Sequence, residues 1–273
     1  MKFLAIVQLT FRESLAKKTF IAFLAISTFI CLLFIFALNL DIVDGAKSSI
    51  RLFGLQAPEL VELNKLIVGV EAGVAILLFT GGIFMSLFAT SNLIPSLLQP
   101  GFIDLFISKP VSRVEIIAGR FIGALAIVAF NIFYLMVFTF LIMSLKTGIW
   151  NWGFLLAGLM IIITFATLFA LMTLLGVVSR SGPFSLMLTY LILFFSPLLL
   201  QRDQIYALLD ARIYSYILDG LYYILPKTAE LGKLTEELVR GVEITNWMPL
   251  WSGILFGIFT LLFSAYIFEQ KDF

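Results

Sequence analysis

Six long apolar runs dominate this sequence of 273 residues and decide what kind of protein it can form. A helix needs about 20 apolar residues to cross a hydrocarbon layer about 30 Å thick. The runs that approach or exceed this length are residues 20–40, 67–92, 117–144, 153–178, 184–200 and 250–268. Hydrophobic residues make up 61% of the chain and charged residues 13%, which excludes an ordinary soluble protein. We therefore predict an all-α membrane protein with six transmembrane helices.

The segments outside these runs are too short for a second globular domain. The two longest are residues 41–66 and 201–249. We therefore expect a single transmembrane domain over residues 1–273. The first run has 21 residues, longer than the core of a signal peptide, so we expect it to remain as the first membrane helix.

The composition excludes several classes of chemistry. The chain has no histidine and one cysteine, Cys31, which excludes Ser-His hydrolysis, His-containing zinc or haem sites, disulfides within the chain and iron–sulfur clusters. No Gly-x-x-x-x-Gly-Lys-Ser/Thr segment occurs. We expect a non-catalytic chain without metal or cofactor, so any ATP must be hydrolysed by another subunit. The net charge of +1 gives no reason to expect nucleic-acid binding.

Charge placement favours cytoplasmic termini. An even number of spans puts both ends on one side, and the Lys and Arg residues then divide nine to nine between the two sides. The nine on the side of the termini lie in shorter segments. The first span also has four basic residues before it and three in the loop after it. The positive-inside rule therefore predicts that both termini are cytoplasmic.

Residues 2–18 have the pattern of an amphipathic helix at the membrane surface. Apolar residues recur at intervals of three and four, while the charged Lys2, Arg12, Glu13, Lys17 and Lys18 occupy other turns. We expect this elbow helix to enter the first span through a bend, with Lys17 and Lys18 anchoring the cytoplasmic end. The alternative is a solvated basic start without helical structure.

The connection between the second and third runs contains two helix breaks. Pro100 and Gly101 end one helix, and Pro110 ends the short amphipathic piece that follows. This pattern predicts a compact cytoplasmic knob that presents Asp104, Lys109 and Arg113 to a partner. An ordinary connecting loop remains the alternative.

The same segment resembles the cytoplasmic loop of ABC-2-type permeases, the membrane subunits of ABC exporters. That loop has a glycine, an acidic residue, a row of aliphatic residues and then Ser-x-Pro-Val-Ser-Arg. The positions that match are Gly101, Asp104, Ser108, Pro110, Val111, Ser112 and Arg113. Residues 11–18 are similar to the elbow helix of the family. Residues 222–226 resemble a segment in its copper-enzyme-maturation subgroup. Gln99 departs from the pattern, because an acidic residue usually stands there.

The resemblance implies a dimeric exporter in which a separate ATPase binds MgATP. The second permease would be another copy or a paralogue, in a prokaryotic cytoplasmic (inner) membrane. The loop between spans two and three would be the coupling helix, with Asp104, Lys109 and Arg113 as ATPase contacts. Arg180, between the fourth and fifth runs, is a second candidate contact, or else an anchor that obeys the positive-inside rule.

Few polar residues lie within the predicted spans. Glu71 is an ionisable candidate for a translocation path, although its place near the outer interface favours a snorkelling side chain. Asn131 and Tyr134 could line a path, but hydrogen bonds between helices are the expected role. Three Gly-x-x-x-Gly pairs predict close helix contacts: Gly69 with Gly73, Gly119 with Gly123, and Gly253 with Gly257.

Residues 201–249 have the pattern of short helices at the outer membrane face. Apolar residues from Ile205 to Leu221 follow helical spacing, and Pro226 should end that helix. We expect a second short helix over residues 228–239. The tyrosines, Trp247 and Trp251 suit an aromatic belt at the membrane interface, with contact to cargo as the alternative.

Two functions from different classes fit these sequence patterns. The first is an exporter permease that depends on a separate ATPase. The second is a structural or assembly subunit of a larger membrane complex. The absence of charge rows in the spans favours amphipathic or lipid-like cargo over an ion, but the sequence does not identify a substrate.

Overall fold

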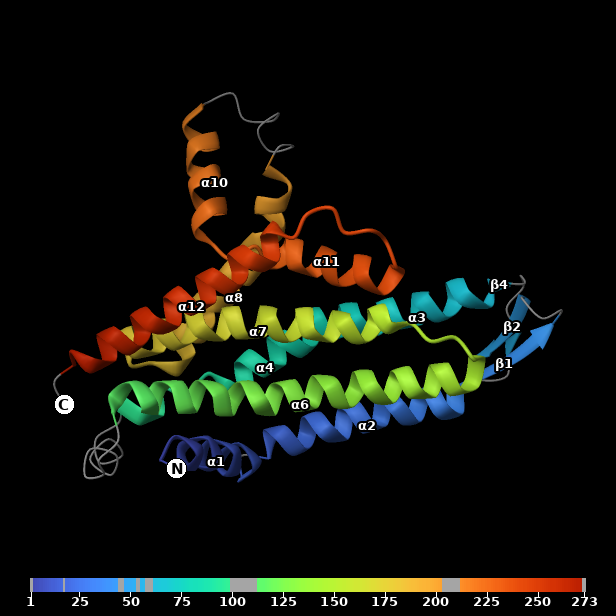
Figure 1. The fold of residues 1–273 in the computed structure, drawn as a ribbon, viewed down its shortest axis with the longest axis horizontal. Helices are drawn as coiled ribbons and strands as arrows, with labels where there is room; N and C mark the ends of the chain where they lie inside the picture. The colour runs from blue at the N-terminus through green and yellow to red at the C-terminus, as the bar shows by residue number, and fades with distance from the viewer. Residues whose placement is uncertain are drawn as a thin grey trace.

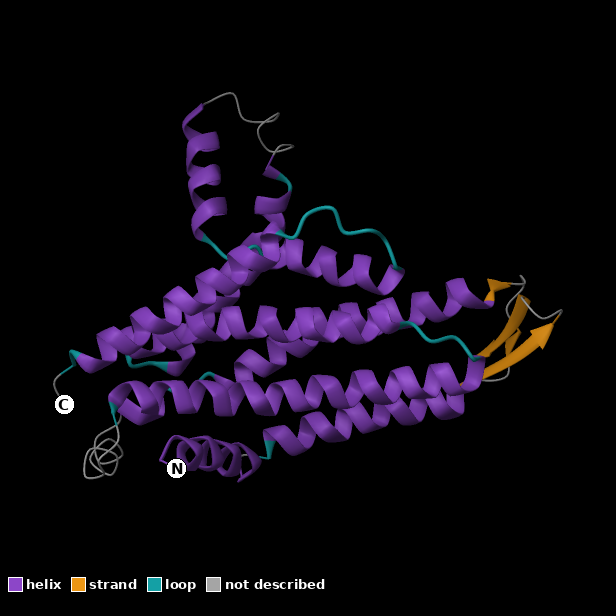
Figure 2. Ribbon diagram, in the orientation of Figure 1, coloured by secondary structure: helices purple, strands orange, loops and turns teal. Residues whose placement is uncertain are grey.

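Long apolar helices lie side by side along the longest axis of the molecule (Figure 1). The computed structural model describes residues 2–16, 18–43, 47–52, 55–56, 61–98, 112–202 and 212–271. The long helices of the bundle are α2 Thr19–Ala37, α3 Leu63–Leu77, α6 Arg113–Thr147, α7 Trp152–Ser179, α8 Gly182–Leu200 and α12 Met248–Glu269. The other described helices are α1 Lys2–Ala16, α4 Ile83–Thr90, α10 Arg212–Ile224 and α11 Thr228–Arg240 (Figure 2).

Five of the described helical segments are long and apolar enough to cross a membrane. They cover residues 64–98, 113–147, 152–179, 182–200 and 248–269. The remaining predicted span, which is the first in the chain, corresponds to α2, whose apolar part Phe20–Phe36 is shorter. The helical membrane architecture is therefore confirmed, and the six-span layout stays a prediction.

The ends of α6 and α7 follow local sequence rules. Ser112 caps α6 by accepting from the backbone N–H of Glu115, whose carboxylate accepts from the N–H of Ser112 in return. Gly148 ends α6 in the left-handed conformation, with φ of 76°. Arg180 ends α7 in the same way, with φ of 56°, before Ser181 caps α8.

A π-helix, η1 Leu78–Gly82, joins α3 to α4, and a 3₁₀ turn, η2 Pro95–Leu98, follows α4. The π-helix contains the adjacent glycines Gly81 and Gly82. A π turn inserts an extra residue into the helical repeat, and such turns are frequent at functional sites. The second predicted span, residues 67–92, is therefore helical as far as residue 90 but carries an irregularity near its middle.

A small antiparallel sheet follows α2 and was not predicted. Its strands are β1 Leu38–Val43, β2 Lys47–Leu52, β3 Leu55–Gln56 and β4 Val61–Glu62. β1 pairs with β2 from Leu38 opposite Leu52 to Val43 opposite Lys47, and β2 also pairs with β3 and β4. The first predicted span, residues 20–40, was wrong at its outer end, because residues 38–40 belong to β1.

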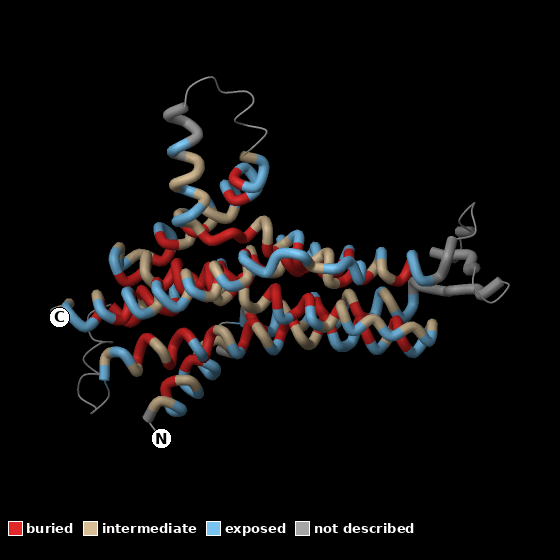
Figure 3. The backbone as a smooth tube through the Cα atoms, turned by 45° about the horizontal axis from the view of Figure 1, so that its top comes forward, coloured by how far each residue is buried: buried red, intermediate tan, exposed pale blue. Residues whose placement is uncertain are grey.

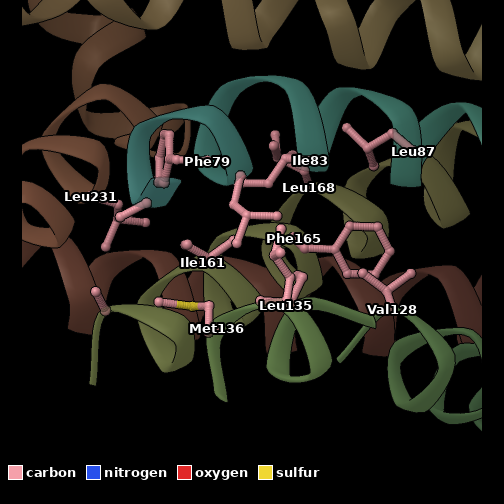
Figure 4. Packing of buried hydrophobic residues seen from close by; sticks show 14 of the residues in the cluster. Phe79, Ile83, Leu87, Val128, Leu135, Met136, Ile161, Phe165, Leu168 and Leu231 are labelled. Atoms are coloured by element: carbon pink, nitrogen blue, oxygen red, sulfur yellow. The ribbon is translucent and has the colours of Figure 1, made fainter. Parts of the chain in front are cut away.

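Helix α7 occupies the centre of the bundle, where it contacts α6, α8, α11 and α12. Buried positions follow its length (Figure 3). Phe165 and Leu168 pack there against residues of α3, α4, α6 and α11, including Ile83, Leu135 and Leu231 (Figure 4). The hydrocarbon of a bilayer is as apolar as these side chains, so close packing and hydrogen bonds hold the bundle together.

The two short helices expected in residues 201–249 are present as α10 and α11. The prolyl segment between them, residues 225–227, breaks the helix as predicted. Helix α11 packs along α3, α7 and α8, with Leu231 and Val239 buried. The first part of the predicted helix, residues 203–211, lies outside the described residues.

Candidate functional site

The described parts of the predicted ATPase-facing surface gather at one end of the bundle. The start of α6, the end of α7 and the C-terminal end of α12 lie together there, and α1 lies beside the start of α6 (Figure 1). Six of the predicted loop residues lie outside the described residues: Gly101, Asp104, Ser108, Lys109, Pro110 and Val111. Ser112 and Arg113 follow them directly and are described.

Arg113 connects the start of α6 to the end of α12. Its Nη1 donates to the carbonyl oxygens of Glu269 at 2.9 Å and Lys271 at 2.5 Å. A guanidinium near the C-terminus of a helix satisfies carbonyls that have no partner within the helix. Arg113 therefore has a positioning role in this chain, next to the role predicted for it at a partner surface.

Lys271 extends this connection to α7. Its ammonium donates to the carbonyl oxygen of Val177, in the last turn of α7. Burial, with a smaller contribution from the nearby charge of Arg180, lowers the pKa of Lys271. Arg180 thus lies at the same end as Arg113, as the sequence-based proposal of a second contact requires.

The predicted elbow helix is α1, and it packs on α6. A Cβ added at Gly119 would lie 2.8 Å from Ile6 Cγ2, and one added at Gly123 would lie 2.7 Å from Thr10 Cβ. These distances are shorter than normal carbon contacts, so the two glycines let α1 approach α6. This Gly-x-x-x-Gly pair therefore makes the kind of helix contact that was predicted.

An ion pair joins the same two helices. Arg120, whose side chain is 0% exposed, donates to the carboxylate of Glu13. Arg12, its neighbour on α1, is exposed. Lys18 lies at the bend before α2, with φ of 57°, and Lys17 lies outside the described residues. The expected elbow and bend are both present.

The three candidates for a translocation path do not form one group. Glu71 lies near the N-terminal end of α7, where Asn151 Nδ2 donates to Glu71 Oε2 at 2.7 Å and to the carbonyl oxygen of Val239 at 2.9 Å. Glu71 is 0% exposed, so the expected snorkelling side chain was wrong. Its carboxylate instead connects α3, α7 and α11 through Asn151.

Asn131 and Tyr134 join α6 to α2, as expected. Ser27 Oγ donates to Asn131 Oδ1 at 3.1 Å, and the hydroxyls of Thr28 and Tyr134 lie 3.0 Å apart. Asn131 also lines a cavity of 300 Å³ between α2, η1 and α6. The hydrogen bonds between helices that were expected for Asn131 and Tyr134 are therefore present, and a role in a translocation path stays a prediction.

A polar cluster outside the bundle's long helices was not predicted. Two cations lie close to the ring of Tyr222, with Arg202 Cζ at 3.6 Å and Lys227 Nζ at 4.2 Å from the ring centroid. The Tyr222 hydroxyl donates to Glu230 at 2.6 Å. Burial and the neighbouring carboxylate of Glu230 raise the pKa of Tyr222 to about 12. The sequence signal was an aromatic residue among charges, which also suits an interfacial belt.

Comparison with known families places the whole chain in one of them. A search of curated proteins finds no match. A family model described as ABC-2 family transporter protein matches residues 4–273. The match covers α1, every predicted span and the connecting loops, and does not distinguish a subgroup. The chain is therefore a multi-pass membrane protein of the ABC-2 transporter family, the permease subunit of an ABC transporter.

Proposed function

We propose that this permease subunit belongs to an ATP-driven exporter of a prokaryotic cytoplasmic membrane. A separate ABC ATPase binds and hydrolyses MgATP, and this chain converts its motion into movement of a substrate. Work with an ABC ATPase is a general property of the family. The absence of a P-loop from the sequence supports the same division of labour.

The observation that carries the proposal is the connected end of the bundle. The loop of residues 99–111 lies between η2 and the cap of α6 in the sequence, and Arg113 and Lys271 tie α6, α7 and α12 together beside it. A displacement of the loop would therefore move several long helices as one body. Rigid helices that shift together are a common means of passing a conformational change across a protein.

The proposal assigns roles to the predicted residues. Gly101, Asp104, Ser108, Lys109, Pro110, Val111 and Ser112 form the coupling segment, with Arg113 and Arg180 at its edge. Arg12, Glu13, Lys17 and Lys18 belong to the elbow at the inner surface, so both termini are cytoplasmic. Asn131 and Tyr134 lie near the substrate path, and Glu71 supports its outer end. Two such bodies, identical or paralogous, form the transporter.

Replacement of Asp104 tests the coupling role. Asp104→Ala should reduce the amount of ATPase that co-purifies with the permease about tenfold, because a charge-assisted contact at an interface is lost. ATP turnover of the complex should fall with it. The measurement is the ratio of ATPase to permease after affinity purification from membranes.

Glu243→Ala is the matched control, because this exposed acidic residue lies beyond α11, near the opposite end of the bundle. It should leave recovery of the ATPase unchanged. Equal recovery with Asp104→Ala and the parent chain, at unchanged ATP turnover, would contradict the coupling role and favour a structural subunit.

A further inference from the structure

A cavity opens between α2, η1 and α6, in the part of the bundle made of apolar helices. Its volume is 300 Å³, the size of a small-molecule site. Most of its wall is apolar, as at Ile30, Leu77 and Leu135, and none of the described residues that line it is ionisable. Such a wall suits an uncharged, apolar occupant.

One polar group in the wall lacks a partner. Asn131 is 8% exposed, and its Oδ1 accepts from Ser27. Its Nδ2 is buried and has no hydrogen-bond partner among the described residues. A buried amide donor without an acceptor is costly, and this cost disappears when a ligand oxygen accepts from it.

The depth of Asn131 limits what that ligand can be. Asn131 lies 11 residues after Arg120 and 15 before Lys146, the charged residues that flank the apolar part of α6. At the rise of an α-helix these separations are about 17 and 23 Å. Asn131 is therefore near the middle of the bilayer, whereas the ester oxygens of a phospholipid stay near the headgroups, about 15 Å away.

The backbone and a second cavity also favour a ligand at this place. Gly81 and Gly82 of the π-helix line the cavity, and a Cβ added at Gly81 would have nothing within 4 Å among the described residues. A smaller cavity of 30 Å³ shares Phe23, Ser86 and Asn131 with the larger one and extends to Ser14 on α1. Together the two cavities extend along the bundle from its middle toward the elbow helix α1.

We propose that this cavity binds an uncharged apolar molecule whose carbonyl or ether oxygen accepts a hydrogen bond from Asn131 Nδ2. Such a molecule dissolves as a whole in the hydrocarbon and can bring its oxygen to mid-membrane depth, which a phospholipid ester cannot. This molecule is the class of cargo for the permease, so that part of the inference rests on the proposed function.

Photolabelling of the full chain in lipid nanodiscs tests the inference. The probe is benzophenone, an uncharged aromatic ketone that reacts on illumination with nearby C–H groups, and mass spectrometry locates the label. Met85 lines the cavity and should be labelled in a saturable manner. Met187, 67% exposed on α8 and outside this cavity, reports label that comes from the lipid.

Two competitors of similar shape show how much the carbonyl group contributes to binding beyond the apolar part of the molecule. Dicyclohexyl ketone should suppress labelling of Met85 at a concentration about tenfold lower than dicyclohexylmethane requires, because one hydrogen bond distinguishes them. This comparison uses the unaltered chain and does not depend on the folding of a variant. Equal potency of the two competitors overturns the proposal.

Three variants test the donor itself. Asn131→Leu should raise the benzophenone concentration that half-saturates the label at Met85 about tenfold and leave Met187 unchanged, whereas Ser27→Ala keeps Nδ2 and should retain the label. Thr139→Val is the matched control and should retain the saturable label at Met85, since Thr139 is buried on α6 but does not line the cavity.

Besides equal potency of the two competitors, three results would overturn the inference. The first is a label at Met85 that does not saturate, as expected if only lipid chains enter the cavity. The second is no label at Met85, as expected if a second copy covers the cavity. The third is an unchanged label in Asn131→Leu. The labelling needs neither ATP nor ATPase, so failure of the coupling test with Asp104→Ala leaves its outcome unaffected.

Discussion

At the scale of single residues, one buried charge in the bundle is paired with an opposite charge from another helix. Arg120 is fully buried, and the carboxylate of Glu13 faces it from α1. Taking a charge out of water is costly, and removing one partner of a buried pair leaves the other uncompensated. The pair therefore holds the elbow helix against the third predicted span.

Glu13→Gln tests this role with little change in shape. We expect it to destabilise the protein by about 2 to 3 kcal/mol, because the guanidinium of Arg120 stays buried without its counter-charge. The measurement is the melting temperature of the purified chain in detergent, which should fall.

Arg12→Gln is the matched control on the same helix, since Arg12 is exposed. It should change the stability by no more than about 0.5 kcal/mol. In a double-mutant cycle, Glu13→Gln combined with Arg120→Gln should cost less than the sum of the two single changes. Strict additivity would show that the two charges do not stabilise each other.

The sequence predicted the residue types at this contact but not the contact. Arg120 follows from the positive-inside pattern, and Glu13 follows from the charged face of residues 2–18. Their pairing spans 107 positions and depends on how α1 lies on α6. Long-range geometry of this kind leaves no periodic signal along the chain. The same reason explains why the contact of Glu71 with Asn151 was missed.

At the scale of elements, two of the three glycine pairs differ in whether another helix packs on them. Gly119 and Gly123 lie against Ile6 and Thr10 of α1, whereas Gly69 and Gly73 have nothing within 4 Å of an added Cβ among the described residues. The spacing is identical in the two cases. Only the packing of another helix decides whether the missing side chain is needed.

Gly123→Ala should therefore destabilise the chain, and Gly73→Ala should not. An alanine at position 123 forces α1 away from α6, since its Cβ would lie 2.7 Å from Thr10 Cβ, and overpacking of this kind costs about 1 to 3 kcal/mol. At position 73 the better helix propensity of alanine should leave stability equal or raise it by up to about 1 kcal/mol. Melting temperatures of the two variants provide the comparison. Equal losses would contradict the assigned helix contact.

Hydropathy located the long helices because a membrane span must be apolar over its full length. It failed at the outer end of the first span, where residues 38–40 continue the apolar run but enter β1. Alternation of Leu38, Asn39, Leu40 and Asp41 is a strand signal, but it is short and directly continues a long apolar run. The π-helix at Leu78–Gly82 also has no signal of its own, since glycines are common in membrane helices.

At the scale of the whole molecule, the two ends of the bundle differ in character. One end carries α1 and the connected ends of α6, α7 and α12, which Arg113 and Lys271 join. The other carries the sheet of β1 to β4 and the contact between Asn151 and the last turn of α11. The proposed function requires the first end to face the cytoplasm and the ATPase.

Cysteine labelling tests this orientation, because the chain has a single cysteine that is easily removed. Cys31 is 5% exposed on α2, so Cys31→Ala supplies a background without thiols. In the Cys31→Ala background, Glu243→Cys places an exposed thiol beyond α11, and Gln270→Cys places one after α12.

A membrane-impermeant maleimide should label Glu243→Cys on intact cells and Gln270→Cys only after the membrane is opened. The reverse pattern would mean an inverted topology, and labelling of both from one side would contradict the separation of the two ends across the membrane. Only the predicted result leaves Asp104 and the surrounding loop on the side where ATP is available to a partner.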